Sequence, residues 1–235
     1  MAPFAARYVE LAAKRPNAPI AISALRQAIQ AIGTTDSAGM TAWETNEAEF
    51  PAGTNLDLPK KLIALLERDH LKSPKLRVAI DRARYNYRLE FGPFLQTAME
   101  STPHRDVKAL ATLFLAMFLT DRLQMLQLAD DRPDMVDRYN ALFGPDYLPG
   151  LRKLKNGDAI QRIEQLLQRA TQYTDVKSPF GDTIAERAER ALYEFRHLRI
   201  GKPSPEITGV DQSDKPFKLS DYHDKVVLLY FWSDL

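Results

Sequence analysis

Side chains able to do chemistry are few and scattered in this sequence. The 235-residue chain contains no cysteine, which excludes disulfides, thiolate-bound zinc and thiol nucleophiles from these residues. None of the histidines has a second histidine or a carboxylate at a spacing that forms a convincing metal-binding set. We therefore expect surface or capping roles for them, with no catalytic residue, no metal site and no cofactor. The four histidines are His70, His104, His197 and His223.

Two short charged clusters are interpreted as solvated surface. Glu44, Glu47 and Glu49 surround Trp43 without the Asp-x-Asp spacing of a calcium loop, which predicts an exposed acidic loop. The basic run at residues 152–155 is typical of an exposed face.

Bulk composition limits the classes of partner. A formal net charge of +1 gives no support for a nucleic-acid or anionic-membrane partner, which would require a strongly basic surface. The longest apolar run, residues 109–119 interrupted by Thr112, is shorter than the roughly 20 residues that cross a bilayer. It predicts a buried core helix and no membrane span, with the stripe Phe114, Met117, Phe118 and Met125 in the core. The residues from Met1 to Phe4 show no signal peptide.

Apolar residues recur at helical spacing up to about residue 197. The first series is broken at residues 15–17, and a second series ends at Gly33, which predicts a helix C-cap there and an irregular loop over residues 34–55. The two series are Phe4, Tyr8, Leu11 and Ala12, then Ile22, Leu25, Ile29 and Ile32. Further helices are predicted at 58–69, 74–91, 94–100, 105–128, 134–143, 158–173 and 182–198.

Proline punctuation favours helical hairpins. Pro16, Pro74 and Pro103 each stand between two helical patterns, near the start of the second, where the missing N–H costs least. No strict 34-residue period is present, so residues 1–197 are predicted to form an α-helical domain of irregular helical hairpin repeats. Such repeats can form a concave surface for a protein partner, which is one functional alternative.

The composition changes at Ile200. Two prolines within residues 201–205 stop the helix, and short strand-compatible stretches follow at 206–210 and 217–219, separated by a turn at 212–215. A one-turn helix is predicted to begin at residues 220–222. The next run, Val226–Trp232, has the aliphatic and aromatic composition of a central strand buried on both faces, which requires neighbouring strands and covering helices.

This C-terminal pattern resembles the redoxin or thiol-disulfide reductase (TlpA-type) branch of the thioredoxin superfamily. The matching stretches are Ile200–Ile207, Lys215–Tyr222 and Lys225–Trp232, in the order and spacing of that branch. Ser204 replaces the usual alanine. Asp224 stands where a glycine normally precedes the lysine, and we expect strain in that turn because glycine tolerates positive φ far better.

The resemblance implies the fold class and the location of the chemistry. The fold is expected to be mainly α, with residues 198–235 forming the truncated N-terminal β-hairpin and first central strand of a thioredoxin-like α/β domain. By the register of the family, a C-x-x-C motif would begin directly after residue 235. The residues adjacent to that missing redox motif are Phe231, Trp232, Ser233, Asp234 and Leu235. They resemble the reductases more than the peroxiredoxins, which stay as a second alternative.

The resemblance also implies an activity for the complete protein. A low-pKa cysteine or selenocysteine would exchange with protein dithiol or disulfide partners, so the cysteine-free chain is expected to be inactive. Two explanations stand for an end at this position: a fragment, or a selenocysteine codon read as a stop. Family members often act outside the cytoplasm. Residues 175–198 more weakly resemble the helical region that precedes a redoxin domain in some bacterial proteins.

Overall fold

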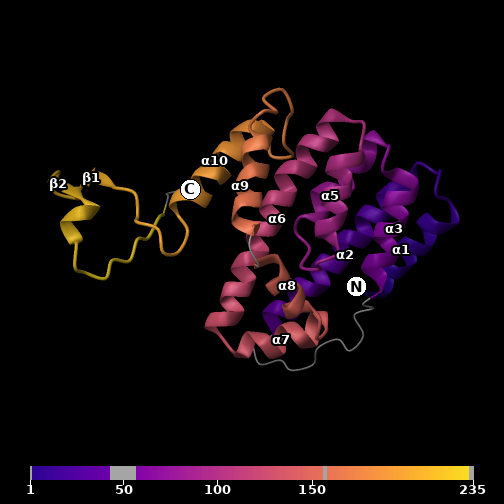
Figure 1. Cartoon of the computed structure of the whole chain (residues 1–235), viewed down its shortest axis with the longest axis horizontal. Helices are drawn as coiled ribbons and strands as arrows, with labels where there is room; N and C mark the ends of the chain where they lie inside the picture. Colours follow the sequence, from indigo (N-terminus) through magenta and orange to yellow (C-terminus); the bar gives the residue numbers. More distant parts are fainter. Residues whose placement is uncertain (1, 43–56, 156–157, 233–235) are drawn as a thin grey trace. The chain divides into compact units, whose positions relative to one another are not determined.

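The computed structural model describes residues 2–42, 57–155 and 158–232 (Figure 1). These residues are mainly α: ten α-helices are present, 67% of the described residues are helical, and a small two-stranded antiparallel sheet lies near the C-terminus. The predicted mainly α class is confirmed. The chain divides into two compact units, Met1–Leu192 and Tyr193–Leu235, so the division falls inside the last helix.

The first two helices pack against each other along the N-terminal part of the helical unit. Helix α1 spans Ala2–Lys14 and helix α2 spans Ile20–Ala42. The predicted break at residues 15–17 is therefore confirmed, because α1 ends immediately before it. The apolar residues of the second series are buried, as their helical spacing predicts: Ile22, Leu25, Ile29 and Ile32.

The predicted end of α2 at Gly33 is wrong, because the helix continues to Ala42. Gly33 does not have the positive φ that a C-cap glycine adopts. Its lack of a side chain serves packing, since a Cβ there would lie 3.2 Å from Nδ2 of Asn86. Asp36, one turn further on, is fully buried, so this part of α2 belongs to the interior. The predicted loop at 34–55 is helical to residue 42, and Trp43 with its glutamates lies outside the described residues.

A chain of short helical segments follows. Helix α3 spans Leu58–Leu65 and runs directly into a π-helical turn, η1, at Leu66–His70. A 3₁₀ turn, η2, spans Pro74–Leu76 and leads into α4 at Arg77–Ala83. The helix predicted at 58–69 is confirmed in its position, with a change of helical type in its last turn.

The helix predicted over 74–91 ends at Ala83, eight residues earlier than expected. The following segment is not helical because its side chains form a hydrogen bond and an ion pair with α2. Asn86 donates a hydrogen bond to the Ile29 carbonyl at 3.0 Å, and Arg88 forms a buried ion pair with Asp36. These tertiary contacts override the local helical periodicity.

Helices α5 and α6 form the centre of the helical unit. Helix α5 spans Phe91–Ser101 and packs on α6, which spans Arg105–Asp131. Every residue from Ala109 to Ala116 is buried, so α6 is covered on all sides over this stretch. Among the described residues α6 is the one helix long and apolar enough to cross a membrane by length and composition, and 72% of its most apolar window is buried inside the protein. This burial confirms the predicted core helix.

Helix α7 spans Asp134–Phe143, as predicted, and is followed by a helix that the pattern does not predict, α8 at Tyr147–Lys155. Pro149 is accommodated because it lies in the first turn, where its missing N–H interrupts no helical hydrogen bond. Gly150 permits a close approach, since a Cβ there would lie 2.5 Å from Cδ1 of Leu89.

The last two helices complete the unit. Helix α9 spans Ala159–Ala170 and packs on α6; helix α10 spans Ile184–His197. A reciprocal capping box begins α10: the Thr183 hydroxyl accepts the Glu186 N–H at 3.1 Å, and the Glu186 carboxylate accepts the Thr183 N–H at 2.7 Å. Both predicted helices are confirmed, each with shorter ends.

The helices form a bundle around α6. This helix contacts α5, α9, α4, α8 and α7, and α2 contacts α1, α4 and α7 (Figure 1). In a linear array of repeats each unit contacts only its neighbours in sequence. The contact between α6 and α9 across the intervening α7 and α8 is therefore characteristic of a bundle with a shared core.

The C-terminal unit carries the two strands, β1 at Thr208–Val210 and β2 at Pro216–Lys218, followed by a 3₁₀ turn, η3, at Leu219–Tyr222. The strands pair antiparallel, with Gly209 opposite Phe217. The predicted hairpin, the turn between its strands and the one-turn helix after it are all confirmed.

Candidate functional site

The candidate site lies in the C-terminal unit, where a small hairpin leads to an exposed apolar segment. The hairpin turn is closed by one carboxylate: Oδ1 of Asp211 accepts the N–H groups of Ser213 and Lys215 at 2.8 and 3.0 Å. Asp214 takes a φ of 59° within this turn. These contacts fix the register of β1 against β2.

A second carboxylate ties the start of the unit to the turn after β2. Oε1 of Glu206 accepts the N–H of Ser220 at 3.1 Å, 14 positions further along the chain. The Leu219 N–H donates to the Ile207 carbonyl at 2.8 Å beside it. The hydrogen bonds from Ser220 hold the pKa of Glu206 below its ordinary value. Asp221 accepts the Lys218 N–H at 2.9 Å and so begins η3.

Asp224 occupies a left-handed backbone conformation immediately before the apolar segment. Its φ is 68°, a region that L-residues other than asparagine and aspartate rarely adopt. The Lys225 N–H closes this turn by donating to the Tyr222 carbonyl at 3.2 Å.

The segment Val226–Trp232 has no regular secondary structure and is exposed. Its side chains range from 41% exposure at Val227 to full exposure at Val226, and Phe231 and Trp232 are 82% and 73% exposed. These two are the predicted site residues that the structure describes. Ser233, Asp234 and Leu235 lie outside the described residues. The structure does not enclose Phe231 or Trp232 in a pocket with other side chains.

The predicted central strand at Val226–Trp232 is not formed in this chain. A strand exists through hydrogen bonds to a neighbour, and among the described residues none joins the backbone of 226–232 to another segment. The composition of this segment favours a strand. No other described segment pairs with it, so the strand does not form.

The four histidines lie in different surroundings. His104 precedes α6 and its Nε2 lies 2.9 Å from the Lys72 carbonyl, while His197 packs on the Tyr193 ring. His223 is exposed. His70 is buried in η1, which rules out the surface half of the predicted surface or capping role, and burial lowers its pKa. Among the described residues, no group of three or more histidines, aspartates or glutamates is arranged to hold a metal ion.

The helical unit contains a buried polar cluster that the sequence does not reveal. Nε and Nη2 of Arg88 donate to the two carboxylate oxygens of Asp36 at 2.8 and 2.7 Å, and both side chains are almost fully buried. Burial raises the pKa of Asp36, and the Arg88 guanidinium opposes this rise. The two residues are 52 positions apart and no local pattern connects them.

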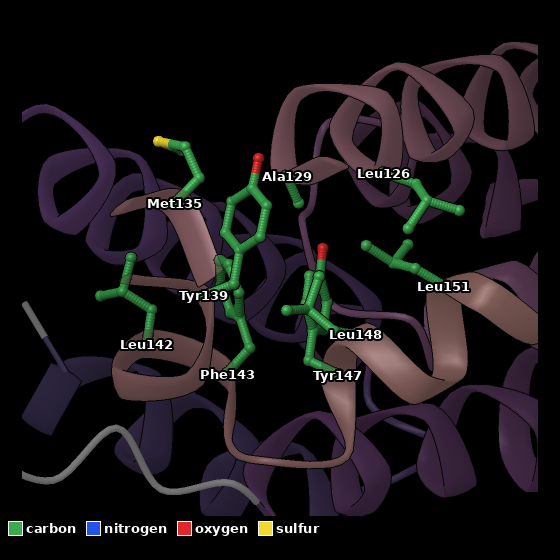
Figure 2. Close-up of a cluster of buried hydrophobic side chains, with 9 residues drawn as sticks. All are labelled: Leu126, Ala129, Met135, Tyr139, Leu142, Phe143, Tyr147, Leu148 and Leu151. Atoms are coloured by element: carbon green, nitrogen blue, oxygen red, sulfur yellow. The ribbon is translucent and has the colours of Figure 1, made fainter. Parts of the chain in front are cut away.

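Two tyrosines, Tyr139 of α7 and Tyr147 of α8, lie in a neighbouring cluster of buried side chains (Figure 2). The Tyr147 hydroxyl donates to the Tyr87 carbonyl at 2.7 Å, and Arg122 of α6 donates to the same carbonyl at 2.5 Å. Burial raises the pKa of Tyr147 to about 12. Figure 2 shows the hydroxyls of Tyr139 and Tyr147 pointing in the same direction, with their ring centroids 5.9 Å apart. The contacts join three helices to the 84–90 segment, which is a structural role.

Comparisons with known proteins leave the family of this chain open. No family model matches it, and neither the curated proteins nor the solved structures contain a match.

Proposed function

We propose that residues 198–235 belong to a thioredoxin-like redoxin domain, and that the complete protein is a thiol-disulfide oxidoreductase with a helical region before that domain. The proposal is supported by the order of elements in the C-terminal unit. A hairpin, a one-turn helix, a residue with positive φ and an uncharged apolar segment follow one another in the order that the resemblance implies.

The observation that carries the proposal is the exposure of Val226–Trp232. A segment of this composition is stable in water when strands pair with it and helices cover both of its faces. A thioredoxin-like domain supplies such a sheet. The strand would then bring Trp232 to the edge where the reactive group of the family lies.

The chemistry requires groups that residues 1–235 do not contain. In the proposed reaction a thiolate or selenolate attacks one sulfur of a substrate disulfide and releases the other as a thiolate. A second cysteine of the enzyme then attacks the mixed disulfide and releases the second substrate thiolate. The substrate disulfide is thereby reduced, and the two enzyme groups are oxidised to a disulfide or selenenylsulfide. Placement at a helix N-terminus would favour the ionised nucleophile.

Two measurements on the natural gene product test the proposal. The transcript is read across the Leu235 codon, and the complete product is assayed for reduction of insulin disulfides by dithiothreitol. We expect the complete product to carry a C-x-x-C motif or its selenocysteine form, and an insulin activity that is lost when the second cysteine is replaced by serine. A continuation without such a motif, or a product without insulin activity, contradicts the proposal. Consumption of peroxide without insulin reduction would instead favour the peroxiredoxin alternative.

A further inference from the structure

Arg122 of α6 is a buried cation that no carboxylate contacts directly. Only 3% of its surface is exposed, and its guanidinium lies over the rings of Phe118 and Tyr87, 4.5 and 5.6 Å from the two centroids. Within the described part of the chain, no aspartate or glutamate forms an ion pair with it. Asp36 and Asp121 act on it only from beyond ion-pair distance. A buried charge without a counter-charge in contact is costly, which favours binding of an anion.

Two buried donors of this region have no acceptor among the described residues. One is the Nε–H group of Arg122, and the other is the hydroxyl of Tyr139, whose side chain is fully buried on α7. The great majority of buried N–H and O–H groups in folded proteins have a partner, and where the protein does not supply one, ordered water or a bound ion can accept the hydrogen bond.

The two donors lie in one place in the fold. The Tyr147 hydroxyl lies 3.3 Å from Nη1 of Arg122, and the Tyr147 ring centroid is 5.9 Å from that of Tyr139. Figure 2 shows the hydroxyls of both tyrosines on the side of the cluster where Ala129 lies. Ala129 follows Arg122 by seven positions on α6, so the two residues share a helix face. The Tyr139 hydroxyl therefore points toward the face of α6 that carries Arg122.

The electrostatic environment of these donors suits an anion better than water. Burial raises the pKa of Tyr139, and the charged side chains that oppose this rise are cationic, first Arg122 and then Arg138. A water molecule can accept both hydrogen bonds, but it does not compensate the charge of Arg122. A small anion does both. The surrounding side chains are mostly apolar, and protein interiors have few voids larger than a water molecule, which favours a monatomic anion.

We propose that the helical unit binds one monatomic anion of the chloride type between Nε of Arg122 and the hydroxyl of Tyr139. The anion accepts a hydrogen bond from each donor and joins α6 to α7. It binds the folded state and stabilises the helical unit. The inference concerns residues of the helical unit alone and does not depend on the proposed redox function.

Urea denaturation of the full chain tests the effect of the anion on stability. Total salt is kept constant while chloride is replaced stepwise by gluconate, an organic anion too large for a monatomic site, and the circular dichroism of the helices is followed. The unfolding constant should fall as chloride rises, by up to about tenfold for each tenfold increase in chloride above the dissociation constant. A parent chain that is equally stable in chloride and in gluconate would overturn the proposal.

Two matched variants assign this dependence to the site. Tyr139→Phe removes one donor and keeps the ring, so it should lose most of the dependence on chloride. Tyr85→Phe is the control, because Tyr85 is a tyrosine of the same unit that is 46% exposed, and it should respond like the parent. A chloride dependence that is undiminished in Tyr139→Phe contradicts the site.

A crystal structure of the full chain grown in sodium bromide locates the anion directly. Bromide replaces chloride, and its anomalous scattering distinguishes it from water. We expect a bromide ion in hydrogen-bond contact with Nε of Arg122 and the hydroxyl of Tyr139. Ordered water at these two donors, with bromide found only at the protein surface, would show that the donors bind water and that any effect of chloride on stability is unspecific.

Discussion

Arg88 and Asp36 form a two-pronged ion pair with almost no solvent access, and this pair fastens the 84–90 segment to the C-terminal part of α2. A second aspartate–arginine pair of the same type, Asp175 with Arg105, lies on the surface, with both side chains 61% exposed. The protein therefore contains a buried and an exposed version of one interaction.

Neutralising the buried carboxylate should destabilise the protein far more than neutralising the exposed one. Asp36→Asn leaves the Arg88 guanidinium buried without its counter-charge, which costs about 3–5 kcal/mol of unfolding free energy. Asp175→Asn should leave the free energy of unfolding almost unchanged, because water and salt screen that exposed pair. Urea denaturation of the two variants measures both values. Equal losses would show that Asp36 is not buried as described.

The protein should lose stability at alkaline pH through Tyr147. Its pKa is about 12 in the folded protein and 10.0 in the unfolded chain, so the unfolded state releases its proton first. The contribution is complete below pH 10 and is lost as pH rises toward 12, amounting to about 3 kcal/mol. Urea denaturation at a series of pH values checks this. Tyr147→Phe should reduce the loss of stability between these limits, and an unchanged profile in that variant would assign the loss to other groups, such as Tyr139, whose pKa burial also raises.

The left-handed turn at Asp224 predicts opposite effects of two substitutions. Asp224→Gly fits a φ of 68° without strain, whereas Asp224→Val introduces a β-branched side chain that this region disfavours by about 1–2 kcal/mol. Hydrogen exchange at the Lys225 amide, which donates to the Tyr222 carbonyl, reports the turn. Exchange should be about 5–30 times faster with valine and no faster than the parent with glycine. Equal exchange in both variants would contradict the described conformation.

Acid should loosen the link between the start of the C-terminal unit and its 3₁₀ turn. The pKa of Glu206 is lowered below 4.5 in the folded unit by the hydrogen bond from Ser220, so its contribution is present above pH 4.5 and is lost as pH falls below it. The amide chemical shift of Ser220 measured by NMR over this range should follow the titration. Glu206→Gln should abolish the dependence, and Asp211→Asn in the hairpin turn serves as a control that retains it.

Local signals predicted the C-terminal hairpin well. Its strands, its turn and its 3₁₀ helix depend on residues within 14 positions of one another, as in the bond from Ser220 to Glu206. The same reasoning located most helices of the larger unit, because their apolar spacing coincides with the face that is buried.

Contacts between distant residues explain most of the errors. Gly33 is the residue type that commonly ends a helix. In the structure its lack of a side chain instead leaves room for Asn86, which packs against it in the core. The helix predicted to extend to Phe91 ends early because Arg88 forms an ion pair with Asp36 of α2. The strand at Val226–Trp232 needs a partner strand, and its own composition cannot supply one.

Helix α6 is synthesised before some of the helices that cover it in the folded protein. Its partners α4 and α5 precede it in the chain, but α8 and α9 follow it, and α9 is complete only at Ala170. During synthesis, a newly emerged α6 thus presents to the cell an apolar helix whose length matches a bilayer, until the later helices close over it.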